Sequence, residues 1–528
     1  MQKSLNLFII ILFLLHLPRT QVLGWGESKK LKEKQALSKG PFRLYLKRDP
    51  RQLNPALVRG TASHYLFYNL YSSLYRYEGN VLKPYLGNHC IWKNALHLSC
   101  QLNPKLKWSN GKTITAKHYL QSYQNLFKTT NTKVRLLLHI KNAKAILQKK
   151  KKLSRLGITA KGFLLNFYLN QPDPELLYKL TYPSLAPQYS LKTPSIKQAH
   201  TLVTNGPYKI KKWTLNQKII LEPNPYFADN SKNQLPLVEV YFVEEDTTAL
   251  LLYQSGRIDF LKQVLTSDIS RFKNHKEFFQ VPMMKFDYLG FSSTLKAYPN
   301  LRKALVYSLN YVELKKIYHA LGQPGYPSLA LSYFSKPVFY DINLKRAKKA
   351  FSKVPLKARN QQWTLAYSKS GGPDIKRGME WLQNQWKKHL GLKIQLRAVE
   401  QGMYIQSLKL KSFPIFRKGI PLDRPTCLAA METLTTGKIN NYIQFSNSTY
   451  DKLVKQLENI VNKNISKRKK KQLQKQLCSK AMEVLLNNYV LIPLGEIHFS
   501  LMMKKQWKGW KLNGLNLLDL SRLRFVTK

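Results

Sequence analysis

The side chains that could carry out acid–base or nucleophilic chemistry are few in this sequence and are scattered along it. A histidine lies close to a glutamate at two places, His275 with Glu277 and His498 with Glu496, and such a pair could act as a general acid and base. No Gly-x-Ser-x-Gly motif occurs, and no glycine-rich phosphate loop follows a predicted strand. We interpret the lone histidines as structural, so the sequence favours a binding protein over an enzyme.

The four cysteines are the other reactive side chains. No Cys-x-x-Cys and no paired histidine spacing occurs, so neither a metal site nor a cofactor is expected. Cys90 and Cys100 flank a predicted hairpin with a loop at Asn94–Leu96, which sets them opposite each other as a disulfide or as two buried thiols. The spacing of Cys427 and Cys478 implies no pairing.

The length of the chain indicates how many domains it forms, and its charge indicates which partners it could bind. A chain of 528 residues is expected to form two or three domains. Its 87 Lys and Arg against 28 Asp and Glu give a formal net charge of +59, which favours contact with polyanions. The basic residues are nevertheless dispersed, and the dense runs Lys149–Lys152 and Lys467–Lys471 contain no aromatic residues. We therefore expect solvated basic faces and no nucleic-acid partner.

The N-terminus predicts export. Lys3 precedes an apolar run, Leu5–Leu17, and the small or apolar residues Val22 and Gly24 follow it, which is the pattern of a secretory signal peptide. The run is shorter than the roughly 20 residues that span a bilayer. We expect cleavage after Gly24 and, because no cysteine follows there, no lipid anchor. The mature protein is expected to be soluble and periplasmic.

The stretch Val203–Phe260 predicts an α/β unit. Gly206-Pro207 is a turn signal, and strands of a hairpin are expected at Tyr208–Ile210 and Lys218–Leu221. Val238, Val240 and Phe242 alternate as in a strand. Asp246 is expected to cap the helix that follows, with Gly256 at its C-terminal end. The unit is hairpin, strand, helix, strand.

The same stretch resembles a known family. Asn205-Gly206-Pro207-Tyr208, then Trp213, Asn224–Phe227 and Leu252–Asp259 follow the order seen in the extracellular peptide-binding proteins of ABC importers, solute-binding protein family 5. Further similar motifs extend the resemblance over nearly the whole mature chain. They are Asn54-Pro55, Leu74–Gly79, a Trp108–Gly111 turn before a helix capped by Thr115, Leu301–Leu305, and the hydrophobic tail Val490–Trp510.

The resemblance implies a fold and a division into domains. The fold is α/β, a two-lobed periplasmic-binding-protein-like fold with an additional subdomain in the first lobe. In that lobe, Thr61 or Ser63 would cap a helix that carries Leu66, Leu70 and Leu74 on one face. The expected boundaries are: 1–24 signal peptide, 41–70 first part of lobe 1, 71–199 extra subdomain, 200–265 second part of lobe 1, 266–490 lobe 2, and 491–528 C-terminal return to lobe 1.

The resemblance also implies ligand-binding residues in SFPIFRKGIPLDRPTCLAAMETL (Ser412–Leu434). In the family's similar segment an Asp holds the ligand amine and an Arg lies near the carboxylate. On that match Asp423 takes the amine, Arg417 is the carboxylate partner, and Gly419 with Ile420 provides a strand edge. Such an edge can pair with the main chain of any peptide, while the two charges neutralise its ends.

This segment departs from the family pattern in its pocket. Ile420 stands where the family has a pocket-lining Trp, Pro421 removes one backbone donor, and two residues are missing between Asp423 and Pro425. Asp423 could also be an ordinary turn residue. In the first lobe Gly60 and Thr61 match a loop that faces the ligand, which a helix N-terminus explains equally well.

The resemblance therefore implies an exported, monomeric receptor that captures oligopeptides and delivers them to the membrane permease of an ABC importer. Within the same class, the solute could instead be a dipeptide, a wall or antimicrobial peptide, or a haem or nickel chelate. From a different class, a basic envelope protein that binds polyanions is the alternative.

Overall fold

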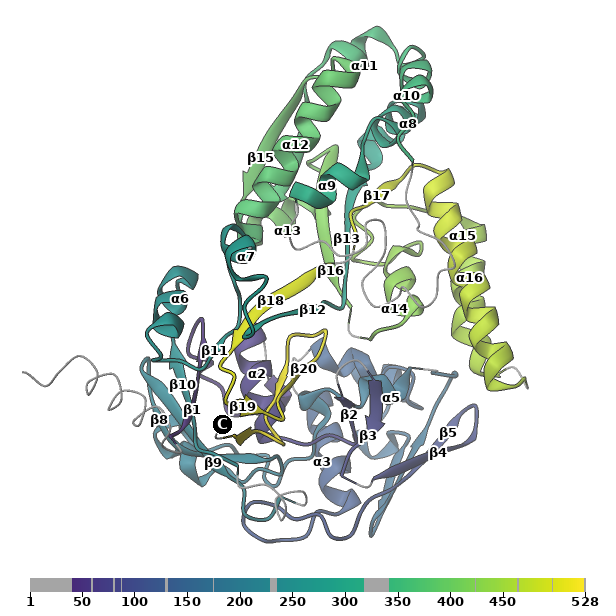
Figure 1. Ribbon diagram of the computed structural model, residues 1–528. Coiled ribbons are helices and arrows are strands. Elements are labelled where there is room, and N and C mark those ends of the chain that lie inside the picture. Colours follow the sequence, from purple (N-terminus) through teal and green to yellow (C-terminus); the bar gives the residue numbers. More distant parts are fainter. Residues whose placement is uncertain are drawn as a thin grey trace, which may run out of the picture. The chain divides into compact units, whose positions relative to one another are not determined.

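The computed structural model of the protein describes residues 40–526 apart from short gaps, at 58–59, 79–80, 87, 129–131, 174, 228–234, 318–340, 423, 463–464 and 496. Residues 41–526 form one compact unit (Figure 1). The expected signal peptide, residues 1–24, lies outside the described residues. Among the residues described, none of the helices combines the length and the apolar composition that crossing a bilayer requires.

Four strands build the first sheet, in the order β1-β10-β9-β8. The predicted hairpin is confirmed as β8 (Tyr208–Thr214) and β9 (Lys218–Pro223), and β10 (Val238–Phe242) runs antiparallel to β9. β1 (Phe42–Leu46) lies parallel to β10 along its whole length. Strands from distant parts of the sequence thus share one core.

A glycine is required at position 206 because two backbone segments approach each other closely there. An added Cβ would lie 2.5 Å from the carbonyl carbon of Leu70, and Gly206 N donates to Leu70 O at 2.8 Å. No side chain fits between them. The glycine of the Asn-Gly-Pro-Tyr motif therefore packs the start of β8 against the end of α2 (Gly60–Leu70).

Helix α2 differs from the prediction at its start. The expected N-cap at Thr61 or Ser63 is wrong, because the helix begins at Gly60 and includes both residues. Leu66 and Leu70 are buried as predicted, and Leu74 is buried beyond the end of the helix. Near the C-terminal end, buried Asn69 donates to Leu518 O at 2.8 Å and accepts from Leu520 N at 3.0 Å.

Helix α6 (Asp246–Gln254) begins one residue earlier than predicted. Glu245 occupies the N-cap position, so the expectation that Asp246 caps the helix is wrong. The Asp246 carboxylate instead pairs with Lys47 Nζ at 2.7 Å. Gly256 has φ +72° just after the helix, as predicted for a glycine that ends one.

A second four-stranded sheet has the order β4-β5-β7-β6. Its strands are β4 (His89–Asn94), β5 (His97–Gln101), β7 (Leu164–Tyr168) and β6 (Ile158–Lys161). Helix α3 (Ala116–Lys128) contacts β6 and β7 and buries Tyr119 and Tyr123. The predicted turn before it is confirmed, because Gly111 N donates to Trp108 O at 2.9 Å and Gly111 has φ +82°.

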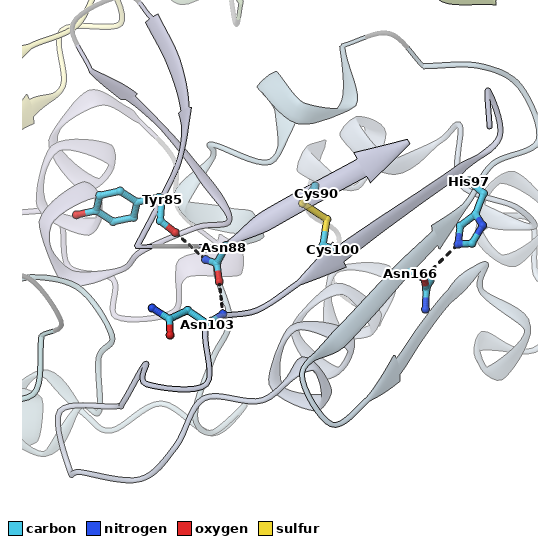
Figure 2. Close-up of a disulfide and its surroundings, with 7 residues drawn as sticks. All are labelled: Tyr85, Asn88, Cys90, His97, Cys100, Asn103 and Asn166. Carbon is cyan, nitrogen blue, oxygen red and sulfur yellow. Dashed lines mark hydrogen bonds between the residues drawn. A yellow bond between two sulfur atoms is a disulfide. The ribbon is translucent and has the colours of Figure 1, made fainter. Parts of the chain in front are cut away.

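The disulfide alternative is confirmed for Cys90 and Cys100, which face each other across β4 and β5 (Figure 2). The loop is shorter than predicted, because Asn94 already pairs with His97 and leaves two residues between the strands. Beside the disulfide, Asn88 Nδ2 donates to Tyr85 O at 2.8 Å and Asn88 Oδ1 accepts from Asn103 N at 3.1 Å. At the other end of β5, His97 Nε2 lies 3.1 Å from Asn166 Oδ1.

The largest sheet has the order β15-β14-β16-β13-β17. Its strands are β15 (Ile394–Val399), β14 (Trp363–Ser368), β16 (Ile415–Pro421), β13 (Lys285–Phe291) and β17 (Leu491–Pro493). Alternate residues of β13 enter two different hydrophobic clusters, Phe286 and Tyr288 in one and Leu289 and Phe291 in the other. Both faces of this sheet are therefore covered, as a sheet with parallel strands requires.

Helices contribute to both clusters. Leu289 and Phe291 pack with α8 (Pro299–Tyr307), α10 (Leu344–Phe351) and α12 (Gly372–Leu390). Phe286 and Tyr288 pack with the helices α13 (Gln401–Lys409), α14 (Cys427–Met431), α15 (Ser448–Glu458) and α16 (Lys467–Asn487). The remaining described α-helices are α4 (Ala143–Leu147), α5 (Leu176–Lys179), α7 (Thr266–Phe272), α9 (Tyr311–Ile317) and α11 (Leu356–Asn360).

A second disulfide, which the spacing did not suggest, joins Cys427 of α14 to Cys478 of α16. Both cysteines are buried in the same hydrophobic cluster. α15 and α16 lie side by side (Figure 1), and α14 contacts both of them. The disulfide thus fixes α14, which lies within the segment Ser412–Leu434 that is expected to bind the ligand.

The C-terminal part of the chain returns to strands from the middle of the sequence. β18 (His498–Met503) lies between β11 (Phe260–Leu261) and β12 (Phe278–Pro282). Three two-stranded pairs complete the described strands: β2 (Tyr75–Glu78) with β3 (Val81–Pro84), β19 (Trp507–Lys508) with β22 (Arg524–Phe525), and β20 (Lys511–Leu512) with β21 (Leu518–Asp519). The domain boundaries expected from the sequence stay predictions.

Candidate functional site

The segment Ser412–Leu434 contains a strand with one open edge. β16 pairs with β13 along its whole length, but with β14 at Ile415 and Phe416 alone. Beyond Phe416, no strand in the described part of the sheet covers the edge of β16 that faces away from β13. An extended peptide can add to such an edge as a further strand.

Two hydrogen bonds show which residues of β16 face the open edge. Leu422 N donates to Met284 O at 2.9 Å, so the even-numbered residues of this segment point their backbone groups towards β13. Tyr404 Oη donates to Arg417 O at 2.6 Å from the other side. Gly419 therefore presents both its N–H and its C=O to the open edge, whereas Pro421 presents a carbonyl alone.

A charged cluster lies beside Gly419. The register sets Gly419 opposite Asp287, whose fully buried carboxylate pairs with Arg417 Nη2 at 2.5 Å and lies 3.7 Å from Lys285 Nζ. Burial, together with the charge of Arg417, lowers the pKa of Lys285 to about 8. Burial also lowers the pKa of neighbouring Lys418. Among the described residues, Arg417, Lys285 and Lys418 lie around the single carboxylate of Asp287, which favours an anionic group at this end of β16.

A second cluster, with the opposite balance of charge, surrounds Arg424. Its guanidinium pairs with Glu175 and, at 2.5 Å, with Glu432 Oε1. Glu175 also accepts a hydrogen bond from Thr426 Oγ1, and the same hydroxyl accepts from Ala429 N at 3.2 Å at the start of α14. Among the described residues, two carboxylates thus surround one guanidinium at this end of the segment, although the whole protein is strongly basic.

The structure brings together three of the six residues predicted for the site, Arg417, Gly419 and Ile420, on β16. Arg417 is 8% exposed and paired with Asp287, and Ile420 is 6% exposed in a hydrophobic cluster. Gly60 and Thr61 form the start of α2. Asp423 lies outside the described residues. The ligand contacts of all six stay predictions.

The interpretation of His275 as structural agrees with its surroundings. Its Nδ1 accepts from the backbone N–H of Glu277 at 3.2 Å, while the Glu277 carboxylate accepts from Tyr253 Oη at 2.7 Å and from Lys505 N at 3.1 Å. Each side chain therefore stabilises a loop through hydrogen bonds. In the other pair, Glu496 lies outside the described residues.

The sequence did not reveal the partners of Arg417 and Thr426. Lys285 and Asp287 come from a strand 130 residues before Arg417, and Glu175 lies 251 residues before Thr426. The signal available in the sequence was the alternation of charged with apolar residues in Lys285–Tyr288. That pattern marks a strand but does not give its register against β16.

The clusters and the fold define a class of protein. The chain belongs to the bacterial extracellular solute-binding proteins, family 5, because the model of the family's middle region matches residues 90–442. The fold is the two-lobed fold of periplasmic peptide-binding proteins, as the solved structures below confirm.

Curated relatives match most of the chain at low identity. The periplasmic murein peptide-binding protein MppA of Escherichia coli is 23% identical to this chain, and the match covers 94% of each of the two proteins. The periplasmic oligopeptide-binding protein OppA of Salmonella typhimurium is 25% identical, over 67% of this chain and 69% of the relative.

Among solved structures, the unliganded open form of the murein tripeptide-binding protein MppA has a TM-score of 0.77 at 21% identity. The match covers 93% of this chain and 98% of that one. Peptide-bound OppA of Listeria monocytogenes has a TM-score of 0.70 at 19% identity, over 93% and 100% of the two chains.

Proposed function

We propose that the protein captures oligopeptides between its two lobes and delivers them to the membrane permease of an ABC importer. The observation that carries this proposal is the open edge of β16, where Gly419 offers a donor and an acceptor to any peptide main chain. A peptide of arbitrary sequence has only its backbone and its two ends in common with others. An edge of this kind recognises the backbone without regard to side chains.

The distribution of charge along the segment supports the same ligand. The cations near Arg417 suit the peptide carboxylate, whereas Glu175 and Glu432 bring carboxylates to Arg424 at the other end of the segment, where the ammonium group would lie. On this proposal Asp423 binds the amine and Arg417 acts near the carboxylate. Relatives and a solved neighbour with a similar fold carry peptide-binding names, which supports the assignment.

The proposal includes where and how the receptor works. It would be exported by its signal peptide to the periplasm, without a lipid anchor, and act there as a monomer and without catalysis. The family is extracellular, and its relatives named above are periplasmic.

Native mass spectrometry of the protein purified from cells tests the proposal, because it identifies the ligand that travels with the protein. A bound peptide, and calorimetric binding of free-amine peptides, are the expected results. A haem or nickel chelate would identify another solute of the same class. Steeply salt-dependent binding of polyanions without affinity for peptides would favour the envelope protein instead.

Lys285 should make peptide binding depend on pH. Its amine is charged below a pKa of about 8 and neutral above it, so its attraction for a ligand carboxylate is present at pH 7 and lost by pH 9.5. We expect C-terminal amidation of a peptide to weaken binding more at pH 7 than at pH 9.5. Because the peptide amine titrates equally in both peptides, the ratio of their dissociation constants isolates the carboxylate. In Lys285→Gln this ratio should not change with pH; an unchanged ratio in the wild type would exclude the role.

Replacement of Gly419 by alanine should leave the fold intact but weaken peptide binding. The added Cβ would lie 2.1 Å from Lys285 Cε, the flexible part of that side chain, so the lysine must move away while the backbone stays. We expect Gly419→Ala to leave the melting temperature nearly unchanged and to raise the peptide dissociation constant about tenfold, or ~1.4 kcal/mol. In a Lys285→Ala background the same substitution should cost much less. Equal losses in both backgrounds would contradict this reasoning.

A further inference from the structure

We propose that a basic and apolar surface at the end of α13 binds anionic phospholipids, so that the protein attaches reversibly to a membrane surface. This membrane-contact surface is formed by α13 with the turn that follows it and by the loop 436–446. Its members are Met403, Lys409, Leu410, Lys411, Lys438 and Ile439. All of them lie outside β16, and the inference does not depend on peptide capture.

Apolar side chains are unusually exposed on this surface. Among the described residues, three of the five most exposed large apolar side chains belong to it: Leu410 at 77%, and Met403 and Ile439 at 66% each. Met403 and Leu410 are seven residues apart, so two helical turns place them on the same side of α13. Such side chains gain free energy when they enter the boundary between the headgroups and the acyl chains of a bilayer.

A cavity of about 360 Å³ lies between the two segments and is lined by lysines. Lys409 and Lys411 line it from the end of α13 and Lys438 from the loop, and all three side chains are exposed. Among the described residues that line the cavity, none is acidic. The nearby carboxylate of Asp451 accepts from Thr436 N at 3.1 Å and from Thr436 Oγ1 at 2.6 Å. Three cations around a hollow suit the phosphate of a lipid headgroup.

Lys411 occupies a backbone position that ordinarily favours glycine. Helix α13 ends in a Schellman motif, in which Ser412 N donates to Ser407 O at 3.0 Å. In the same motif Lys411 N donates to Leu408 O at 3.2 Å. Lys411 has φ +61°, in the left-handed region where a side chain is unfavourable. A lysine here costs stability, which favours a role for its side chain outside folding.

The loop that carries Ile439 is braced by a buried amide. Asn441 Nδ2 donates to Leu434 O at 3.2 Å and to Phe445 O at 2.8 Å, and Asn441 Oδ1 accepts from Phe445 N at 3.2 Å. Both ends of the loop are thereby joined through one side chain. Ile439 is therefore presented in a fixed position, which reduces the entropy lost when it enters a bilayer.

The pattern of charge favours an anionic bilayer as the partner. The net charge of +59 attracts the protein to any polyanion but selects no particular face. In Lys409-Leu410-Lys411 and Lys438-Ile439, each apolar side chain has a lysine next to it in the sequence. At a membrane surface the apolar groups enter the boundary region while the ammonium groups stay with the phosphates.

Vesicle flotation of the exported protein tests the inference, with phosphatidylcholine alone or mixed with equal parts of phosphatidylglycerol. We expect binding to the mixed vesicles and little to phosphatidylcholine. Joint replacement of Lys409, Lys411 and Lys438 by glutamine should weaken binding roughly 100-fold, because each lysine near an anionic surface contributes roughly fivefold. Leu410→Ser with Ile439→Ser should weaken it roughly tenfold or more.

Lys411→Gly separates lipid binding from folding. Glycine relieves the left-handed backbone, so the melting temperature should stay the same or rise. Binding to the mixed vesicles should nevertheless weaken about fivefold. A variant with a lower melting temperature and unchanged vesicle binding would show that Lys411 serves the fold, and would overturn its role at the membrane.

Matched controls change the same chemistry elsewhere in the chain. Joint replacement of Lys469, Lys471 and Lys475 by glutamine removes three exposed cations from α16. Leu251→Ser with Leu356→Ser removes two apolar side chains that are each 66% exposed. Both controls should change vesicle binding by no more than about threefold, since they alter only the long-range attraction.

Four results would overturn the inference. They are equal binding to both kinds of vesicle, equal losses in the two lysine variants, unchanged binding without Leu410 and Ile439, and binding of soluble polyphosphate as tight as that of vesicles. The last result would assign the surface to polyanions in solution. Peptide affinity, measured by calorimetry, should stay unchanged in every variant, because none alters the open edge of β16.

Discussion

Asp423→Ala is expected to weaken the binding of a free-amine peptide by about 2–5 kcal/mol, or roughly 30-fold to several thousand-fold in the dissociation constant. The loss is large because a buried ammonium group without its carboxylate keeps its desolvation cost and loses its partner. Calorimetry with the wild type and the variant measures the effect. The basic composition strengthens the expectation, because 28 acidic residues against 87 basic ones leave few other anions for the amine.

The N-acetylated form of the same peptide is the control for Asp423. It carries no amine, so it should bind the wild type weakly and should lose little further affinity in the variant. If the wild type binds the free-amine and acetylated peptides equally well, Asp423 has no role in holding an amine, whatever the variant does.

Removal of the Cys427–Cys478 disulfide is expected to have the second largest effect. In the chain-entropy model, a cross-link that closes a loop of about 50 residues stabilises a protein by about 4 kcal/mol; the sequence separation here is 51. Paired replacement by serine should lower the free energy of unfolding by about that amount, as measured by urea denaturation. The loss should include the packing of α14, and therefore peptide affinity as well.

The Cys90–Cys100 disulfide supplies the comparison. It closes a loop with a sequence separation of 10, for which the same model gives about 3 kcal/mol. Its paired serine variant should therefore be destabilised less and, because the disulfide lies in a different sheet from β16, should bind peptides with unchanged affinity. A larger loss of peptide affinity in this variant than in the Cys427–Cys478 variant would contradict the account.

Local structure was the part that the sequence could predict. The hairpin β8–β9, the strand β10 and the glycine that ends α6 each depend on neighbouring residues, so a few positions decide them. The Cys90–Cys100 pairing belongs to the same class, since two adjacent strands place both sulfurs. Cap positions were harder to predict, because a shift of one residue at α6, and of two or four at α2, changes which residue lies at the helix N-terminus.

Contacts between distant segments could not be predicted in the same way. The cluster of Arg417, Asp287 and Lys285 depends on the register between β13 and β16, and a shift of one residue would move Asp287 to the other face of the sheet. Cys427 and Cys478 meet because two helices pack together, and Glu175 reaches Arg424 only in the assembled fold. The sequence therefore predicted a segment that binds the ligand but not the long-range contacts that the structure gives it.

The two hydrogen bonds that join Asn69 to Leu518 and Leu520 have a consequence for the biogenesis of the protein. The first strand and α2 share a hydrophobic cluster with Leu501, Trp507 and Leu523, so the earliest part of the polypeptide to be synthesised lacks part of its interior until the last residues arrive. During synthesis the first strand and α2 are therefore expected to stay incompletely packed until the C-terminal residues have emerged. The maturation of the protein should depend on holding factors that keep it from aggregating in the meantime.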